Sequence, residues 1–544
     1  MKKSTMKKSY KYISIVLFIM LSGCSDIIDL QSESNIAEEI FYSNYTEIQA
    51  GLTGCYKGLQ KPLTTEWSLT ELRSDNCVMD TGSSNSVVNQ DFSYLDQLYP
   101  ATSHLGNYIY WLNTYNNIRN TNVVLNAVGA EYNEITGAIE YTPIDTSIAT
   151  AAQCKSIAAE ASFIRAYHYF NLVRLYGGVF LIHEAITPAE SKTINRSSVN
   201  DIYKLIEADL KNADANGSKA TFSATPANLI GHANSWAAKA LLAKVYLTLN
   251  RKAEAIVLLN SIRTSSGYGL ESTYANVFSV NNEMNKEILF TIRFKSGGVG
   301  LGNPLANLFA PSNSGNAIVN GDGKGYNTPS SELAVTAASF DPSSTRRLVN
   351  IQPYAKIFYV SKFTTKAALE DDAENDFPVI RYADVLLMLA EAQGNSATSI
   401  GYINDVRRRA GSLTDLSTTL TTANFEKALS NERRWEFAFE NQRFFDLVRF
   451  TTTTETIATL PAATIVTSKS YTTPAYTGKA EGAEFVMKKH FNVQYKIYAK
   501  FENTLPLTPI DLFENAKLDR FLLPIPQYEI DTNSNLVIEQ NPSY

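Results

Sequence analysis

The spacing of apolar residues along the chain is the first feature that predicts structure. From Glu47 onward, apolar side chains recur every three or four residues, as on the buried face of an amphipathic helix. The segment 158–175 is so densely apolar that we expect burial on more than one side, and the glycines Gly177 and Gly178 are expected to end it. The same spacing predicts further helices over 106–128, 198–212, 234–248 and 252–262.

Two of these helices have the residue order of a helical repeat. Leu242, Ala243 and Tyr246 on one helix, with Ala255 and Leu259 on the next, match the large, small and aromatic positions of a tetratricopeptide hairpin. Each hairpin needs neighbours to bury its apolar face, so the sequence predicts a mainly α fold built as an array of such hairpins. Similar pairs are predicted at 383–393 with 400–410, and at 424–439 with 443–450.

Long insertions separate the predicted hairpins. The segment 264–380 is rich in Gly, Ser, Asn and Thr and contains short alternating strands, the clearest at 287–294. Because unstructured loops of this length are uncommon, we expect a folded insertion that faces a ligand and ends in a strand at 377–380. A second such region is predicted at 451–520, and prolines should keep 522–526 extended.

The amino terminus reads as an export signal. Lysines precede a short apolar stretch, and Leu21-Ser22-Gly23-Cys24 matches the pattern in which a bacterial lipoprotein is acylated on cysteine and then cut. The stretch is too short to span a bilayer as a helix. We therefore expect residues 1–23 to be a signal peptide, and Cys24 to hold the mature protein to a membrane by lipid alone.

Charge and cysteine content exclude several functions. Lys and Arg total 48 against 54 Asp and Glu, which leaves no broad basic surface for nucleic acid. Cys55, Cys77 and Cys154 support neither a disulfide framework nor a zinc site, and we expect them to be buried and free. No cofactor or metal is predicted, and the glycines at 298–302 and 323–325 are interpreted as plain turns.

Carboxylates near the carboxyl end allow an enzymatic alternative. Glu436 and Glu440 could be the acid and base of a glycosidase, which needs two carboxylates beside the bond. However, arginines are interleaved with them at three or four residues, so we expect structural ion pairs that keep both ionised. The set comprises Arg433, Arg434, Glu436, Glu440, Arg443, Asp446 and Arg449. The acidic run at 370–376 lacks the EF-hand spacing and is interpreted as a solvated loop.

Several motifs taken in order resemble the SusD/RagB family of outer-membrane nutrient-binding lipoproteins, over nearly the whole chain. Besides the motif ending at Cys24, they are Trp111–Ile118, Glu160–Gly177, Asn285–Phe290, Arg381–Ala392, Ile403–Gly411, Glu432–Arg449, Leu523–Pro526 and Gln540–Pro542.

This resemblance implies a SusD-like fold on tetratricopeptide-like units, in one domain spanning 24–544. Its parts would be a repeat-containing portion at about 24–270, the insertion at about 264–380 and a RagB/SusD-type portion at about 281–544. The resemblance also implies a lid over a SusC-like TonB-dependent barrel transporter, anchored at the outer membrane and facing the exterior. Such a protein binds glycans or oligopeptides and is not an enzyme.

Ligand residues are suggested by the aromatic platforms of the family's glycan binders. Three of the four tryptophans fall in scaffold motifs, which leaves Trp67 near a binding loop. The segment 76–91, where the family tends to place ligand contacts, contains no aromatic residue before Phe92, which argues against starch-like stacking. Tyr326 is the strongest single candidate. The candidate set is Tyr326, Phe309, Asn327, Trp67, Asp80 and Tyr94.

Three functional hypotheses remain open from the sequence. The first is a non-catalytic, lipid-anchored glycan-binding component of an importer. The second is a lid of the same kind that binds oligopeptides, which the aromatic-poor 76–91 segment permits. The third is a surface glycosidase that uses Glu436 and Glu440.

Overall fold

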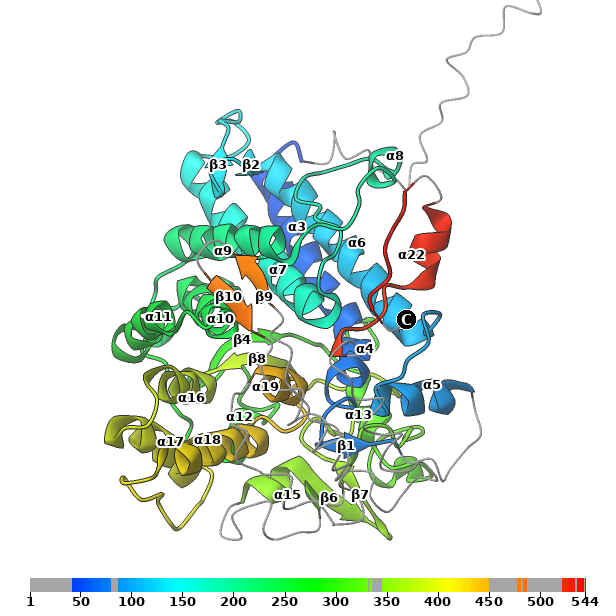
Figure 1. Ribbon diagram of the computed structural model, residues 1–544, viewed down its shortest axis with the longest axis vertical. Helices are drawn as coiled ribbons and strands as arrows, with labels where there is room; N and C mark the ends of the chain where they lie inside the picture. The colour runs from blue at the N-terminus through cyan, green and yellow to red at the C-terminus, as the bar shows by residue number, and fades with distance from the viewer. Residues whose placement is uncertain are drawn as a thin grey trace, which may run out of the picture.

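Helices form most of the protein, and the long ones pack on one another in an array, as predicted (Figure 1). In Figure 1 the array runs from α3 and α6, past α7, α9, α10 and α11, to α16, α17 and α18, while α15, β6 and β7 of the insertion lie at the lower edge and β4 and β8 lie near the middle. The computed structural model describes residues 42–79, 87–330, 333–334, 345–449, 477–480, 483–486, 521–533, 536–542 and 544.

Apart from α4, the long helices lie where the sequence predicts helices. They are α3 (Tyr45–Gly58), α4 (Gln60–Thr70), α6 (Leu105–Ala127), α7 (Ala151–Tyr176), α9 (Val199–Asn216), α10 (Ser235–Thr248), α11 (Lys252–Ser265), α16 (Tyr382–Gln393), α17 (Ala397–Arg409) and α18 (Thr422–Glu436). Shorter helices are α5 (Val87–Asp96), α8 (Pro188–Ser191), α12 (Tyr274–Val277), α13 (Leu305–Phe309), α15 (Arg346–Asn350), α19 (Arg443–Arg449) and α22 (Gln527–Thr532).

Local signals explain where the central helix α7 begins and ends. Thr150 and Gln153 form a reciprocal capping box at its start, which satisfies amide groups that have no partner inside the helix. Gly177 ends it with a φ of 73°, a left-handed conformation that glycine adopts without strain. Almost every side chain from Ile157 to Tyr176 is buried, which confirms the predicted burial on several sides.

The tetratricopeptide hairpin is confirmed in α10 and α11. Leu242, Ala243 and Tyr246 on α10 and Ala255 and Leu259 on α11 are all buried, and the two helices pack together. The later pair differs in one detail, because α18 stops at Glu436 and not at 439. Phe439 has a φ of 67°, which no α-helix accommodates.

The strands form antiparallel two-stranded pairs. The pairs are β1 (Cys77–Val78) with β5 (Thr328–Pro329), β2 (Ala130–Asn133) with β3 (Ala138–Tyr141), β4 (Ile288–Ile292) with β8 (Phe377–Arg381), β6 (Ile351–Tyr354) with β7 (Ile357–Val360), and β9 (Thr477–Ala480) with β10 (Ala483–Val486). Strands β4 and β8 begin and end the predicted insertion and pair with each other, so the insertion leaves and rejoins the array at one place. The predicted extended segment is also confirmed, and Leu523 N donates to Leu175 O at 2.7 Å.

Some elements were not predicted from the sequence. Helices α4 and α5 contain many Ser, Thr and Asn residues, which weaken the apolar period, and the β2–β3 hairpin is too short to give a strong alternating pattern. Cys55, Cys77 and Cys154 are buried, as expected. Among the described helices, none is long and apolar enough to cross a membrane.

A polar contact between α3, α7 and the loop before α10 makes stability depend on pH. His232 Nδ1 lies 2.7 Å from Glu160 Oε2, which also accepts from the Tyr56 hydroxyl at 2.5 Å. The hydrogen bond to Glu160 raises the pKa of His232. Because the folded-state pKa is raised, this contact stabilises the fold below the unfolded histidine pKa of about 6.5 and loses its effect as pH rises through the folded value.

We therefore expect His232→Gln to flatten the dependence of unfolding free energy on pH. The loss should be largest near pH 5 and vanish at high pH, and should stay below about 1 kcal/mol because the imidazole is partly solvated. Urea unfolding of wild type and variant from pH 5 to pH 9 measures this difference. A difference that is constant with pH would contradict the assignment.

Candidate functional site

The two segments that the sequence singled out for ligand contact lie side by side. Strand β1 lies in the first part of the 76–91 segment, and β5 follows directly after Tyr326 and Asn327. The strands pair with Cys77 opposite Pro329 and Val78 opposite Thr328. Residues more than two hundred positions apart in the sequence therefore meet at one place on the molecule.

Buried charges hold this strand pair on the carboxyl-terminal helices. Asp75, just before β1, accepts from Arg443 Nε at 2.7 Å and Nη2 at 3.0 Å, and Arg434 lies 3.3 Å from the same carboxylate. The Ser330 hydroxyl, just after β5, donates to Asp75 O at 2.9 Å. Bidentate arginine–carboxylate pairs fix orientation as well as distance, so the strand pair has a rigid base.

Four aromatic rings from four separate segments form a cluster above this base. Trp67 of α4 is stacked on Tyr326, with ring centroids 6.0 Å apart and an interplanar angle of 16°. Phe92 of α5 contacts both rings, at 5.1 Å from Trp67 and 5.0 Å from Tyr326. Phe309 at the end of α13 meets the edge of Trp67 at 5.6 Å.

Exposure divides this cluster into a buried layer and an accessible layer. Trp67 and Phe309 are only 2% and 1% exposed, so they support the site from below and are not positioned to touch a ligand. Tyr326 and Phe92 are half-buried and present part of each ring to solvent. The structure thus brings three of the candidate residues together. It adds Phe92, which follows the aromatic-poor 76–91 segment and was not among the predicted ligand residues.

The other candidates have different positions. Asn327 is fully buried with a φ of 55°, and neither atom of its amide has a hydrogen-bond partner among the described residues. Tyr94 is 36% exposed but lies two positions after Phe92 on α5, which places it on the other side of that helix. Asp80 and Cys24 lie outside the described residues.

A polar cleft that the sequence did not predict adjoins the cluster. It has a volume of about 460 Å³ and shares α4 and α13 with the rings, since Thr64 and Pro304 line it. Its other walls are the glycine turn around Gly298 and Gly300 and the loop containing Glu370. Both glycines have a positive φ, which confirms that this motif is a turn.

The acidic run at 370–376 is not the freely solvated loop that we expected. Asp372 is buried and accepts from the amides of Gly297 and Gly298 at 2.7 and 2.9 Å. Asp376 accepts from Arg293 Nε at 3.0 Å. The run therefore fastens the glycine turn in place, because backbone amides and an arginine satisfy its carboxylates. Within the described part of the chain no cluster of potential metal ligands is found.

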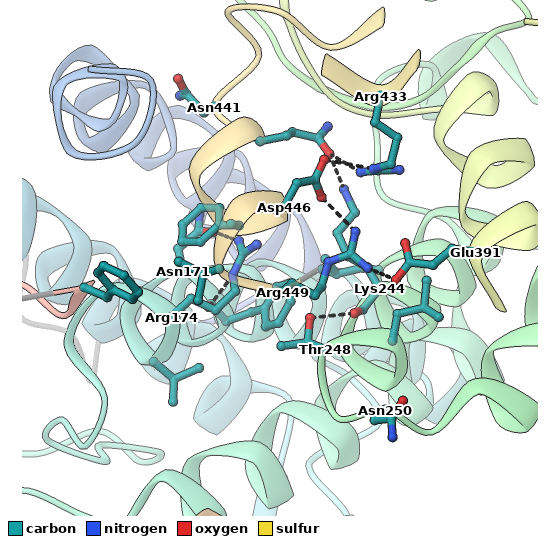
Figure 2. Close-up of a pocket in the computed structure, with 18 of the residues that line it drawn as sticks. Asn171, Arg174, Lys244, Thr248, Asn250, Glu391, Arg433, Asn441, Asp446 and Arg449 are labelled. Atoms are coloured by element: carbon teal, nitrogen blue, oxygen red, sulfur yellow. Dashed lines mark hydrogen bonds and ion pairs between the residues drawn. The ribbon is translucent and has the colours of Figure 1, made fainter. Parts of the chain in front are cut away.

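A second cavity, of about 310 Å³, lies between α7, α10, α18 and α19 (Figure 2). Its charged groups pair with one another: Lys244 lies 2.6 Å from Asp384, and Asp446 accepts from Arg433 at 2.8 Å and Arg449 at 2.7 Å. The described chain breaks off after Arg449 and, apart from residues 477–480 and 483–486, resumes at Phe521. Arg449 and Phe521 are both on the cavity wall, so we assign this cavity no ligand.

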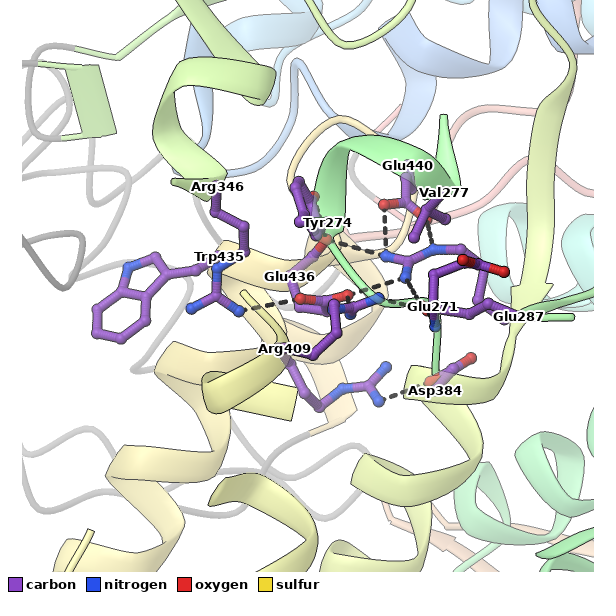
Figure 3. A network of polar contacts seen from close by, with 12 residues as sticks. Glu271, Tyr274, Val277, Glu287, Arg346, Asp384, Arg409, Trp435, Glu436 and Glu440 are labelled. Atoms are coloured by element: carbon purple, nitrogen blue, oxygen red, sulfur yellow. Dashed lines mark hydrogen bonds and ion pairs between the residues drawn. The ribbon is translucent and has the colours of Figure 1, made fainter. Parts of the chain in front are cut away.

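The proposed acid and base of a glycosidase are buried in an ion-pair network (Figure 3). Glu436 and Glu440 are 0% and 3% exposed. Arg381 donates to Glu436 at 2.9 Å and to Glu440 at 2.8 and 2.9 Å, and Arg346 donates to Glu436 at 3.0 Å. Burial tends to raise the pKa of Glu436, but the surrounding arginines outweigh it and hold this pKa below its usual range.

The network confirms structural ion pairing but corrects the predicted partners. Apart from Asp446 with Arg449, the partners are not neighbours at three or four residues. They come from distant elements, namely β8, α15, α17 and the strand β4 region. A buried, fully ionised carboxylate has neither access to a polymer nor the raised pKa of a general acid.

The fold and site together define a class: a helical-repeat protein whose insertion loops gather aromatic rings and a polar cleft on a rigid base. Two family models match the sequence, one described as the SusD family over residues 316–544, and one described as "Starch-binding associating with outer membrane" over residues 26–247. The chain belongs to the SusD-like family.

Similar proteins agree with this assignment. The SusD-like protein P25 of Formosa agariphila is 26% identical over 492 residues, which cover 80% of this chain and 89% of that protein. A laminarin-binding SusD-like protein superposes with a TM-score of 0.67 at 23% identity, over 92% of this chain and 100% of the other. Surface glycan-binding protein A of Bacteroides thetaiotaomicron, in complex with laminarihexaose, gives a TM-score of 0.64 at 18% identity, over 91% and 99%.

Proposed function

We propose that this protein is a non-catalytic glycan-binding lipoprotein of the outer membrane, which delivers its ligand to a SusC-like TonB-dependent barrel transporter. One matching family model is described as starch-binding and associated with the outer membrane, and two similar structures are named for glycan binding. In this proposal, acylated Cys24 is the anchor, the protein faces the cell exterior, and residues 24–544 act as one unit with the parts predicted from the sequence.

The observation that carries the proposal is the convergence of Tyr326 and Phe92 on the β1–β5 pair. The C–H faces of sugar rings pack on flat aromatic surfaces, and their hydroxyls need hydrogen-bond partners nearby. The two half-exposed rings offer such a surface, and buried Trp67 and Phe309 hold it in place. The adjoining cleft supplies carboxylate, amide and hydroxyl groups.

A non-catalytic role follows from the same geometry. The carboxylates most similar to a catalytic pair, Glu436 and Glu440, form ion pairs with arginines and Lys362 within the core. The proposal therefore expects a bound oligosaccharide to be recovered with its chain length unchanged.

We expect Tyr326→Ala to weaken glycan binding about tenfold or more, because a central aromatic contact typically contributes more than 1 kcal/mol. Tyr326→Phe should retain most of the affinity, since it keeps the ring. Calorimetric titration against a panel of oligosaccharides, first screened with wild type, measures the effect.

The half-buried Tyr402 on α17 offers a matched control, because it lies at the far end of the array (Figure 1). Tyr402→Ala should bind as wild type does. Binding of oligopeptides in place of every glycan, or shortening of the bound glycan, would overturn the proposed function.

A further inference from the structure

A second aromatic surface lies outside the candidate site, on the first half of α6. Leu105, Tyr108 and Leu112 follow one another at three and four residues, so they form one stripe on the outer face of this helix. Leu105 is 60% and Leu112 is 39% exposed. A long helix in a packed array normally turns polar residues outward, so an apolar outer stripe indicates an interaction surface.

The short helix α22 completes this surface with a second tyrosine. The ring of Tyr528, which is 56% exposed, lies 4.9 Å from the ring of Tyr108 at an angle of 52°. Figure 1 shows α22 beside α6. The amide of Gln527 donates to Thr102 O at 3.0 Å, which fixes the start of α22 against the turn before α6. We call Leu105, Tyr108, Leu112 and Tyr528 the tyrosine surface.

This surface is held in place from below. Asn107 donates to Pro524 O at 2.9 Å and accepts from the buried Tyr176 hydroxyl at 2.6 Å. The Gln540 side chain accepts from Ile525 N at 2.7 Å and donates to Ile525 O at 2.8 Å. The two tyrosines therefore need little ordering when a ligand binds, which favours affinity.

The charge of the surrounding chain restricts the ligand. The described segments 87–118, 521–533 and 536–542, which build this part of the molecule, contain no lysine or arginine, while Glu529 and Asp531 are on α22 itself. Along the stripe of α6 the next cation is Arg119, about two turns beyond Leu112. A sulfated or uronic polymer would be repelled by the carboxylates of Glu529 and Asp531, whereas a neutral sugar would meet two rings and carboxylate acceptors.

The chain connects this surface to the candidate site. Phe92, which belongs to the aromatic cluster, is on α5, and the chain then passes through exposed Tyr99 to Leu105 and Tyr108. His104 Nε2, just before Leu105, lies 3.2 Å from Asp91 O, just before Phe92, so the start of α6 lies against α5 and a polymer bound at the cluster can continue toward Leu105 and Tyr108. A short oligosaccharide would occupy the cluster alone.

We propose that the tyrosine surface is a second glycan contact, which binds a neutral polysaccharide that extends from the Tyr326 site. The proposal rests on the proposed function and adds the class of glycan and a dependence on its length. Two linked contacts on one polymer raise the overall affinity without any change at the first contact.

The test compares a neutral polysaccharide with the hexasaccharide of the same sugar, using laminarin and laminarihexaose first and other neutral pairs if wild type does not bind these. The variant carries Tyr108→Ala and Tyr528→Ala. We expect its affinity for the polysaccharide to fall about tenfold, with the hexasaccharide unchanged, because only the long chain reaches both contacts. Tyr528→Phe should bind as wild type does, and Tyr326→Ala should weaken both ligands.

Each other outcome overturns the proposal in a distinguishable way. An unchanged polysaccharide affinity removes the second contact and leaves the proposed function intact. Equal losses for both ligands would place these rings in the primary site or in the fold. Binding of alginate but of no neutral polysaccharide would overturn the assigned glycan class. Loss of a barrel protein from membrane pull-downs, with glycan affinity unchanged, would assign the surface to a protein contact. Failure of wild type to bind any glycan would overturn the proposed function and this inference with it.

Discussion

Replacing Arg381 by methionine is expected to lower the free energy of unfolding by about 3–5 kcal/mol, the cost typical of removing one partner from a buried ion pair. Its guanidinium donates to three carboxylates, at 2.8 Å to Glu287, 2.9 Å to Glu436 and 2.8 Å to Glu440. Methionine fills much of the same space but leaves these acids buried beside fewer cations (Figure 3). Urea unfolding followed by circular dichroism measures the change.

The exposed Arg408 provides the control for this experiment. It pairs with Asp405 at 2.8 Å and Asp415 at 2.5 Å, but all three side chains are about half exposed. Because solvent screens such pairs, Arg408→Met should leave the free energy of unfolding close to that of wild type. If Arg381→Met does not accumulate, Arg381→Lys keeps the charge without the forked geometry and should give an intermediate loss. Equal effects at positions 381 and 408 would contradict the role of burial.

Trp67→Ala is expected to destabilise the protein by about 3–5 kcal/mol, as large-to-small changes of buried aromatic residues do. Trp67 packs against three rings, and its indole Nε1 donates to Thr64 O at 3.1 Å. Its removal would leave a cavity beneath Tyr326. Thermal and urea unfolding, together with glycan titration at a temperature where the variant is folded, separate stability from binding.

Trp67→Phe keeps an aromatic ring at this position and should recover most of the stability. We expect its glycan affinity to stay close to that of wild type, because the ring supports Tyr326 without touching the ligand. A stable Trp67→Ala variant that lost glycan binding would instead show that Trp67 itself contacts the ligand, as the sequence alone had suggested.

The residues of the candidate site could be predicted only in part from the sequence. Trp67, Phe309 and Tyr326 were each selected from loop position and residue type, and the structure places them in one cluster. The sequence did not show how deeply each ring is buried. In the structure two of the three are buried and one is accessible. Depth depends on which helices pack over a ring, and Phe92 of α5 covers part of this cluster.

The sequence by itself determined most of the long helices, the glycine end of α7 and the repeat hairpin of α10 and α11, because these depend on residues three or four positions apart and on the residue that ends the helix. Only the tertiary structure decided the partners of the charged groups. Arg381 meets Glu440 across 59 residues, and Arg443 meets Asp75 across 368. A buried charge is stabilised by whichever opposite charge the fold brings within hydrogen-bond distance. No local pattern in the sequence predicts which residue that partner is.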